Sequence, residues 1–83
     1  MEKSRFQLLS RSGCHLCDEM AVLLDEILPT YGLAYETCNV DENEEWQRRF
    51  SEVVPVLLRD GTPVAKIRLD RARLRRIVRR RRS

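Results

Sequence analysis

Long hydrophobic runs are missing from this chain of 83 residues. Its uninterrupted apolar stretches are only a few residues long, whereas a helix that spans a bilayer needs about 20. The first residues include Glu2, Lys3 and Arg5 instead of the apolar segment of a signal peptide. We therefore expect neither a membrane span nor a signal peptide, and we predict a cytoplasmic protein.

Cysteine is also scarce. Three cysteines are an odd number in a chain for which we expect no export signal, which argues against a framework of structural disulfides. We expect reduced thiols with redox or metal chemistry instead. Cys14 and Cys17 form a C-x-x-C motif, whereas Cys38 lies in a predicted strand, where a free cysteine usually packs in the core.

Nothing in the sequence marks a second domain. Eighty-three residues can bury one hydrophobic core, and no repeat or linker divides them. We predict a single domain over residues 1–83, with an arginine-rich C-terminal end at 79–83. Charge is divided unevenly, because residues 70–83 contain eight arginines and one acid, a local charge of +7, which leaves −4 for the rest.

The spacing of apolar residues predicts four strands and three helices. The predicted strands cover residues 5–10, 33–40, 55–59 and 62–68, and the predicted helices cover 14–28, 44–50 and the segment after Asp70. The predicted order is therefore β-α-β-α-β-β-α.

Local signals set the ends of these elements. Pro29 should end the first helix, one of the residues in 41–43 should cap the second, and Asp70 should cap the third. Asp60-Gly61 is a strong hairpin signal. The first β-α-β unit demands a parallel strand pair with a right-handed crossover, and the hairpin demands an antiparallel pair. Together they predict an α/β fold with a small mixed sheet covered by helices.

Three features in combination indicate a known superfamily. Cys14-His15-Leu16-Cys17 stands at the first strand-to-helix junction, and Val54-Pro55 opens the third strand. With the order of elements, these motifs make the chain resemble the thioredoxin superfamily, and more narrowly a glutaredoxin-like protein, from about Arg5 to Val78. The resemblance implies a four-stranded thioredoxin-like fold with helices on both faces, and thiol–disulfide oxidoreductase activity.

The cysteine pair is the candidate catalytic site. Unpaired N–H groups at the start of a helix carry partial positive charge, which stabilises a thiolate and lowers its pKa. Cys14 is therefore the candidate nucleophile and Cys17 the candidate resolving thiol. The alternative is half of a zinc site, but a structural zinc site needs four ligands, and only His15 and Cys38 are further soft donors. We predict no metal.

His15, inside the motif, and Arg11, just before it, are candidate modulating residues. A protonated His15 would stabilise the thiolate and make the pair more oxidising, although Asp18 and Glu19 act in the opposite sense. Its alternative is an exposed loop residue. The resemblance implies that Arg11 meets a substrate carboxylate and favours the thiolate. The alternative for Arg11 is an ordinary solvated loop charge.

Val54 and Pro55 are the candidate substrate-binding residues. By resemblance, Pro55 follows a cis peptide bond and lies against the thiols, and the main chain of Val54 offers hydrogen bonds to the substrate. Without the resemblance, Pro55 would be interpreted as an edge-strand proline with a trans bond.

The family pattern is not complete. His15 replaces the proline that typically follows the first cysteine, and 67–70 replaces a Gly-Gly pair that helps hold glutathione. We predict no bound cofactor, with glutathione as a candidate co-substrate only. The expected partner is a disulfide-containing protein or a low-molecular-weight thiol, with no membrane, and the expected state is a monomer.

The arginine tail raises a separate class of function. Arginines can attract phosphates without sequence preference, but Leu74, Ile77 and Val78 indicate a helix whose outer face the arginines form. No base-reading motif accompanies them, so we do not expect nucleic-acid binding. Two rival functions remain open, namely a noncatalytic thioredoxin-like module for binding or redox sensing, and metal or iron–sulfur binding through Cys14 in an oligomer.

Overall fold

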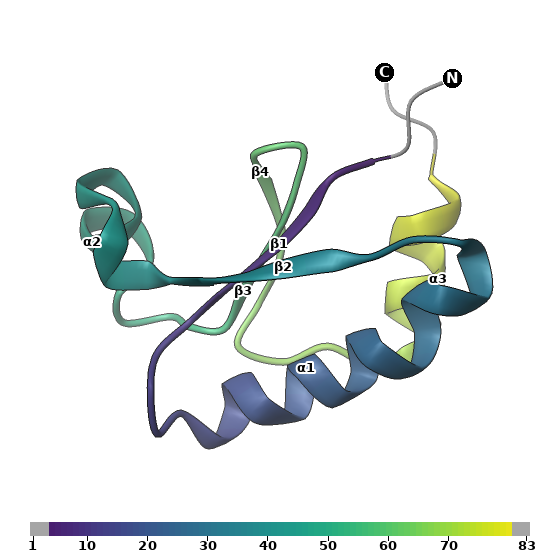
Figure 1. Cartoon of the computed structure of the whole chain (residues 1–83), viewed down its shortest axis with the longest axis horizontal. Coiled ribbons are helices and arrows are strands. Elements are labelled where there is room, and N and C mark those ends of the chain that lie inside the picture. Colours follow the sequence, from purple (N-terminus) through teal and green to yellow (C-terminus); the bar gives the residue numbers. More distant parts are fainter. Residues whose placement is uncertain (1–3, 81–83) are drawn as a thin grey trace.

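A four-stranded mixed sheet forms the centre of the molecule, with strand order β2-β1-β3-β4 (Figure 1). The computed structural model describes residues 4–80. The strands are β1 (Phe6–Ser10), β2 (Tyr35–Asn39), β3 (Val56–Arg59) and β4 (Thr62–Lys66), and the helices are α1 (His15–Ile27), α2 (Glu44–Phe50) and α3 (Arg71–Arg79). Short 3-10 turns cover Leu28–Tyr31 and Val40–Glu42. The predicted order of elements and the mixed sheet are confirmed.

The central strand β1 pairs with β2 in parallel and with β3 in antiparallel orientation, so that Leu9 faces Cys38 on one side and Val56 on the other. The hairpin between β3 and β4 has a two-residue turn with positive φ at both Asp60 (51°) and Gly61 (85°). Positive φ at both central residues is typical of the type I′ turn that Asp-Gly favours. The hairpin prediction is therefore confirmed.

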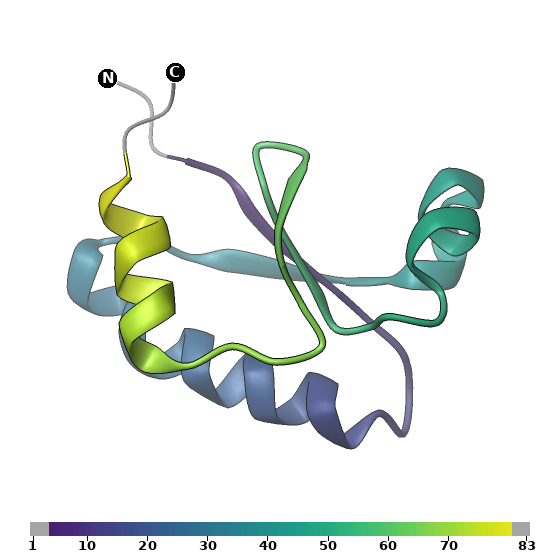
Figure 2. The same cartoon turned by 180° about the vertical axis from the view of Figure 1, so that it is seen from behind.

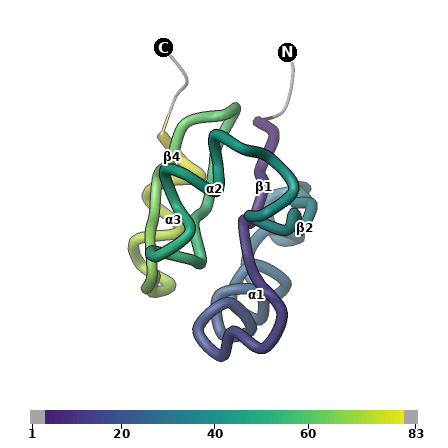
Figure 3. Tube along the Cα trace, turned by 90° about the vertical axis from the view of Figure 1, so that its left-hand side faces the viewer, coloured from purple at the N-terminus to yellow at the C-terminus, as the bar shows by residue number. Residues whose placement is uncertain are grey.

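The sheet has a hydrophobic core on each face, because successive side chains of a strand point to opposite sides. The larger core joins Leu8 of β1 and Leu57 of β3 to buried residues of α1 and to Leu74 of α3. The other core joins Leu9 and Val56 to buried Phe50 of α2. Figure 3 shows α1 beneath β1 and β2, and α3 beside β4. The helices thus cover both faces, as predicted.

Helix α1 forms because its apolar residues recur on one face. Met20, Leu24 and Ile27 are all buried and lie three or four residues apart. The predicted helix, 14–28, was one residue too long at each end. Helix α1 ends at Ile27, before Pro29. Pro29 lies in the first turn of the 3-10 helix Leu28–Tyr31, where the helix needs no N–H from it.

All four predicted strands were too long, the first by one residue, because β1 begins at Phe6 instead of Arg5. β1 has five residues, so β2 pairs only over Tyr35–Asn39, and the rest of the predicted strand 33–40 has no ladder partner. The third strand begins at Val56 instead of Pro55, because proline cannot donate a ladder hydrogen bond. The fourth strand ends at Lys66 instead of residue 68, because the chain turns at Ile67.

Side-chain caps begin the two later helices. The Asn43 carboxamide oxygen accepts hydrogen bonds from two backbone N–H groups of α2, and the Asp70 carboxylate accepts one from Arg73 at 2.8 Å. Leu74 is fully buried, while Ile77 and Val78 pack beside the core at its margin. Of the arginine-rich end at 79–83, residues 81–83 lie outside the described residues. None of the described helices is long and apolar enough to cross a membrane.

We expect Leu24→Ala to lower the free energy of unfolding by about 2–5 kcal/mol, because it opens a cavity in the larger core. Val22→Ala is the matched control in the same helix, because Val22 is 64% exposed and Leu24 fully buried. Exposed positions usually change stability by about 0.5 kcal/mol or less. Urea denaturation of both variants measures the difference, and equal losses would contradict this assignment of the core.

Candidate redox site

A tight turn connects the end of β1 to the start of α1 and places Cys14 there. The Cys14 N–H donates to the Arg11 carbonyl oxygen at 3.3 Å. Gly13, the third residue of this turn, has φ +74°, a left-handed conformation that glycine adopts at little cost. The sequence Ser12-Gly13 therefore sets the place of the first cysteine through the backbone alone.

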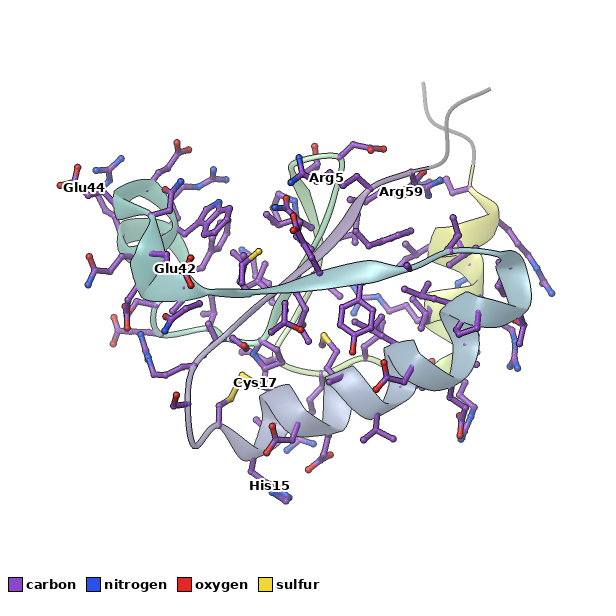
Figure 4. The ribbon with its side chains drawn as sticks, viewed as in Figure 1. Arg5, His15, Cys17, Glu42, Glu44 and Arg59 are labelled. Carbon is purple, nitrogen blue, oxygen red and sulfur yellow. A yellow bond between two sulfur atoms is a disulfide. The ribbon has the colours of Figure 1, made fainter. Side chains whose placement is uncertain are left out.

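Cys14 is the N-cap of α1, and its Sγ accepts a hydrogen bond from the Cys17 N–H at 3.1 Å. The two cysteines form a disulfide, with their Cα atoms 5.2 Å apart. Cys17 is only 3% exposed, whereas Cys14 is half-buried. Figure 4 shows Cys17 at the start of α1, next to the end of the sheet. A partner approaching this pair therefore meets Cys14 first.

His15 lies on the outer face of the first helical turn. Its side chain is 87% exposed and points away from the sheet (Figure 4). The His15 Nε2 lies 3.1 Å from a carboxylate oxygen of Glu19, one turn further along the helix. The positive charge of a protonated His15 would thus interact with the Glu19 carboxylate as well as with the groups at the start of α1. Its effect on the thiol remains a prediction.

Arg11 has a role that the sequence did not indicate. Its guanidinium donates to the carbonyl and the hydroxyl oxygen of Ser51, both at 3.0 Å, and lies 3.4 Å from the Asp41 carboxylate. The interpretation as an ordinary solvated charge is therefore wrong. Ser51 is 40 residues away, so no local signal could have found it. Arg11 ties the turn before Cys14 to the segment that leads into Val54, and its contact with a substrate carboxylate remains a prediction.

Val54 and Pro55 lie at the same end of the sheet as Cys14. Because β3 runs antiparallel to β1 and Val56 pairs with Leu9, the chain enters β3 where β1 ends. Pro55 is fully buried, and its peptide bond with Val54 is cis. Val54 is half-buried. The register therefore brings both predicted substrate-binding residues to the end of the sheet that carries the disulfide.

Ile67 begins the segment 67–70 that replaces the family's Gly-Gly pair, but its conformation was not predicted from the sequence. Its N–H donates to the Pro55 carbonyl oxygen at 2.7 Å, and the Arg68 N–H donates to Lys66 at 2.7 Å, which closes a tight turn around Ile67. Its φ is +67°, although it is β-branched, and it is 41% exposed. Together with Leu16 it lines a groove of about 380 Å³ beside α1. A branched side chain gives no sequence signal for a left-handed conformation.

Comparison with known proteins agrees with this arrangement. The model of the glutaredoxin-like domain family (DUF836) matches residues 5–79. The chain belongs to this family.

Individual relatives extend the match. The uncharacterized protein Rv0508 of Mycobacterium tuberculosis is 31% identical over 80 residues, which cover 90% of this chain and 82% of that protein. Protein Ne2328 from Nitrosomonas europaea, known from a solution NMR structure, superposes with a TM-score of 0.80 at 28% identity and covers 94% of each chain. Fasciola hepatica thioredoxin superposes with a TM-score of 0.61 at 19% identity, over 92% of this chain and 78% of that one. The thioredoxin fold predicted from the sequence is confirmed.

The third cysteine of this glutaredoxin-like domain lies in β2, on the side of the sheet that carries α2. Cys38 is half-buried and packs against the smaller core, and the Gln7 amide approaches its Sγ at 3.8 Å. Burial raises the pKa of the Cys38 thiol, and the neighbouring Glu36 carboxylate adds to the increase. The core role is confirmed in part, because the side chain packs against the core but keeps some exposure.

Within residues 4–80, no group of three or more histidine, cysteine, aspartate or glutamate side chains is placed to hold a metal ion.

We expect Cys38 to react slowly with iodoacetamide at neutral pH. A thiol reacts as its thiolate, and a raised pKa moves the rise in rate to higher pH. The measurement uses the Cys14→Ser/Cys17→Ser variant, in which Cys38 is the only thiol, and follows alkylation by mass spectrometry across pH. The same variant in urea is the control, and its alkylation should rise at lower pH than that of the folded protein. Faster alkylation of the folded protein would contradict the assigned burial.

Proposed function

We propose that this glutaredoxin-like domain is a thiol–disulfide oxidoreductase with Cys14 as nucleophile and Cys17 as resolving thiol. The unequal exposure of the two cysteines carries the proposal, because Cys14 is half-buried and Cys17 is 3% exposed. An incoming disulfide can reach Cys14, whereas Cys17 can reach only a sulfur already attached beside it. This asymmetry supports distinct roles for the two thiols.

The reaction is a pair of thiol–disulfide exchanges. The Cys14 thiolate attacks one sulfur of the partner disulfide, so that a Cys14–partner bond forms, the partner's S–S bond breaks and the first partner thiolate leaves. The Cys17 thiolate then attacks the Cys14 sulfur and releases the second partner thiolate. The partner gains two electrons and, on protonation, two protons, while the Cys14–Cys17 pair is oxidised to the disulfide.

The start of α1 supplies the electrostatic assistance. The Cys17 N–H already points at the Cys14 Sγ across 3.1 Å, and in the reduced protein the same N–H would bind the thiolate. Negative charge at this end of a helix is favoured by the unpaired N–H groups. The negative charge of Asp18 in the first turn destabilises the thiolate. A protonated His15 would stabilise the thiolate and so offset the effect of Asp18.

Backbone groups at the end of the sheet that carries the disulfide would hold the substrate. Val54 is half-buried beside buried Pro55, so its main chain is a candidate partner for an extended peptide around the substrate disulfide. Arg11 supports this segment through Ser51. The proposed substrate is a disulfide-containing protein or a low-molecular-weight disulfide. A thiol such as glutathione would act as co-substrate by reducing the Cys14–Cys17 disulfide in two further exchanges.

We expect Cys17→Ser to accumulate a mixed disulfide between Cys14 and a model disulfide substrate, because the resolving thiol is missing. Cys14→Ser should lose reduction of the same substrate almost completely. Mass spectrometry without reductant measures the adduct, and an insulin-reduction assay measures turnover.

Cys38→Ser is the matched control for these variants and should keep activity close to that of the unmodified protein, because Cys38 lies outside the pair. Normal turnover by Cys14→Ser would sink the assignment of the nucleophile. An adduct on Cys38 instead of Cys14 would do the same.

The noncatalytic alternative makes a different prediction for the thiol pKa. If the start of α1 activates Cys14 for catalysis, its pKa lies below the ordinary thiol value of about 8.5. Ultraviolet absorbance of the thiolate during a pH titration measures it, with Cys14→Ser as the blank. A Cys14 pKa at or above the ordinary value, together with no turnover, would favour a binding or sensing module.

A further inference from the structure

A groove of about 1100 Å³ lies between the β3–β4 hairpin and α3, away from the disulfide. Figure 2 shows α3 rising beside this hairpin. The charged residues that line the groove are five arginines and one acid, namely Arg59, Arg73, Arg76, Arg79, Arg80 and Asp60. We call it the arginine groove. Its lining carries a formal excess of positive charge that the redox chemistry does not use.

Two of these arginines are held in place without losing their charge. The Arg59 guanidinium donates to the Ile77 carbonyl oxygen and to the Ser4 hydroxyl, and that of Arg73 donates to the Val64 carbonyl oxygen at 3.2 Å. These acceptors are neutral, so they orient the guanidinium groups but leave them cationic. A guanidinium has five N–H donors, and the remaining ones stay available for an anion.

Two further arginines lack an acidic partner among residues 4–80. Arg76 and Arg80 are exposed and form no ion pair with any other residue in the described range 4–80. The one ion pair that α3 makes within that range joins Arg71 to Glu26 of α1, and Arg71 does not line the arginine groove. The carboxylate of Asp60 accepts the backbone N–H of Arg5. Among the described residues, the arginine groove is therefore lined by fixed arginines and by arginines without an acidic partner.

The spacing of the arginines favours a repeating anion. Arg73 and Arg76 lie three residues apart on α3, and Arg80 is the C-cap of the same helix. At 1.5 Å per residue, the three arginines span about 10 Å along the helix axis. A nucleic-acid strand presents phosphates at regular intervals along such a span. An acidic protein surface would need an apolar or aromatic anchor as well, and the described groove lining contains no aromatic side chain.

We propose that the arginine groove binds the phosphodiester backbone of a nucleic-acid strand without sequence preference. Guanidinium groups pair with phosphates in bidentate fashion, and no feature of the groove reads bases. Figure 4 shows Arg59 and Cys17 near opposite ends of β1. A bound strand would therefore leave the disulfide open to its own partner, and this proposal is independent of the redox function.

The test measures fluorescence anisotropy of labelled oligothymidylate and oligodeoxyadenylate of equal length with the full chain. Binding should weaken steeply between about 50 and 200 mM salt, with a log–log slope of about −2 to −4 for three to five phosphate contacts. Arg76→Glu should weaken binding about tenfold or more at low salt and reduce the slope by about 1. Similar affinities for the two strands would support recognition of the backbone, and tight binding of only one would overturn it.

Arg75→Glu is the matched control. Arg75 is also exposed on α3 and the change in net charge is identical, but Arg75 does not line the groove. It should change the affinity by less than about threefold. Equal losses in Arg75→Glu and Arg76→Glu would overturn the proposal, because overall charge would then explain binding. Circular dichroism and disulfide reduction verify the fold of both variants, and Arg80→Glu replaces Arg76→Glu if the latter unfolds.

Two other probes test whether the arginine groove prefers a nucleic acid to other anions. Polyglutamate of equal charge should bind at least about tenfold more weakly than the oligonucleotides, because it lacks the phosphate geometry that guanidinium groups match. Vesicles containing phosphatidylglycerol should compete poorly for a different reason, because their phosphates are not joined at regular intervals along one strand. Equal or tighter binding of either probe would overturn the assignment to nucleic acid and identify the groove as a site for acidic proteins or for membranes.

Discussion

Parallel pairing of β1 with β2 is the constraint on which the rest of this structure depends. Two neighbouring strands that run in the same direction require the chain to return across the sheet, and α1 makes that return. The helix must therefore start where β1 ends, and Cys14 occupies its N-cap. The same strand supplies Leu8 to one core and Leu9 to the other. Placement of the reactive sulfur and burial of both faces thus follow from one topological requirement.

One side-chain contact and one backbone contact assemble the end of the sheet that carries the disulfide. The turn before Cys14, the segment after α2 and the end of β4 are far apart in sequence. Arg11 joins the first two by binding Ser51, and the Pro55 carbonyl joins the last by accepting the Ile67 N–H. Three loops held in this way give a frame around a disulfide whose more exposed member is Cys14. Such a frame can keep its geometry while many of the side chains around it differ.

The sequence predicted features with a local cause. Asp70 caps α3, and Asp60-Gly61 makes the hairpin, because each signal acts within a few residues. It could not predict that β2 would stop at Asn39, since that end depends on the length of its neighbour. The contact of Arg11 with Ser51 and the arginine groove were equally hidden, because both require distant segments to be packed first. At the site, the motif located the two cysteines, but their unequal exposure is a property of packing.

The turn at residue 67 has a consequence for how the domain can vary. A left-handed backbone costs a residue with a Cβ about 1–2 kcal/mol, and Ile67, at φ +67° and 41% exposed, recovers only part of this through burial. The hydrogen bonds that hold the turn come from main-chain atoms of Pro55 and Lys66, so they do not depend on which side chain is present. Glycine would keep the turn and remove the cost together with the branched group. The groove beside α1 can therefore change its chemical character through one residue while the course of the chain stays the same.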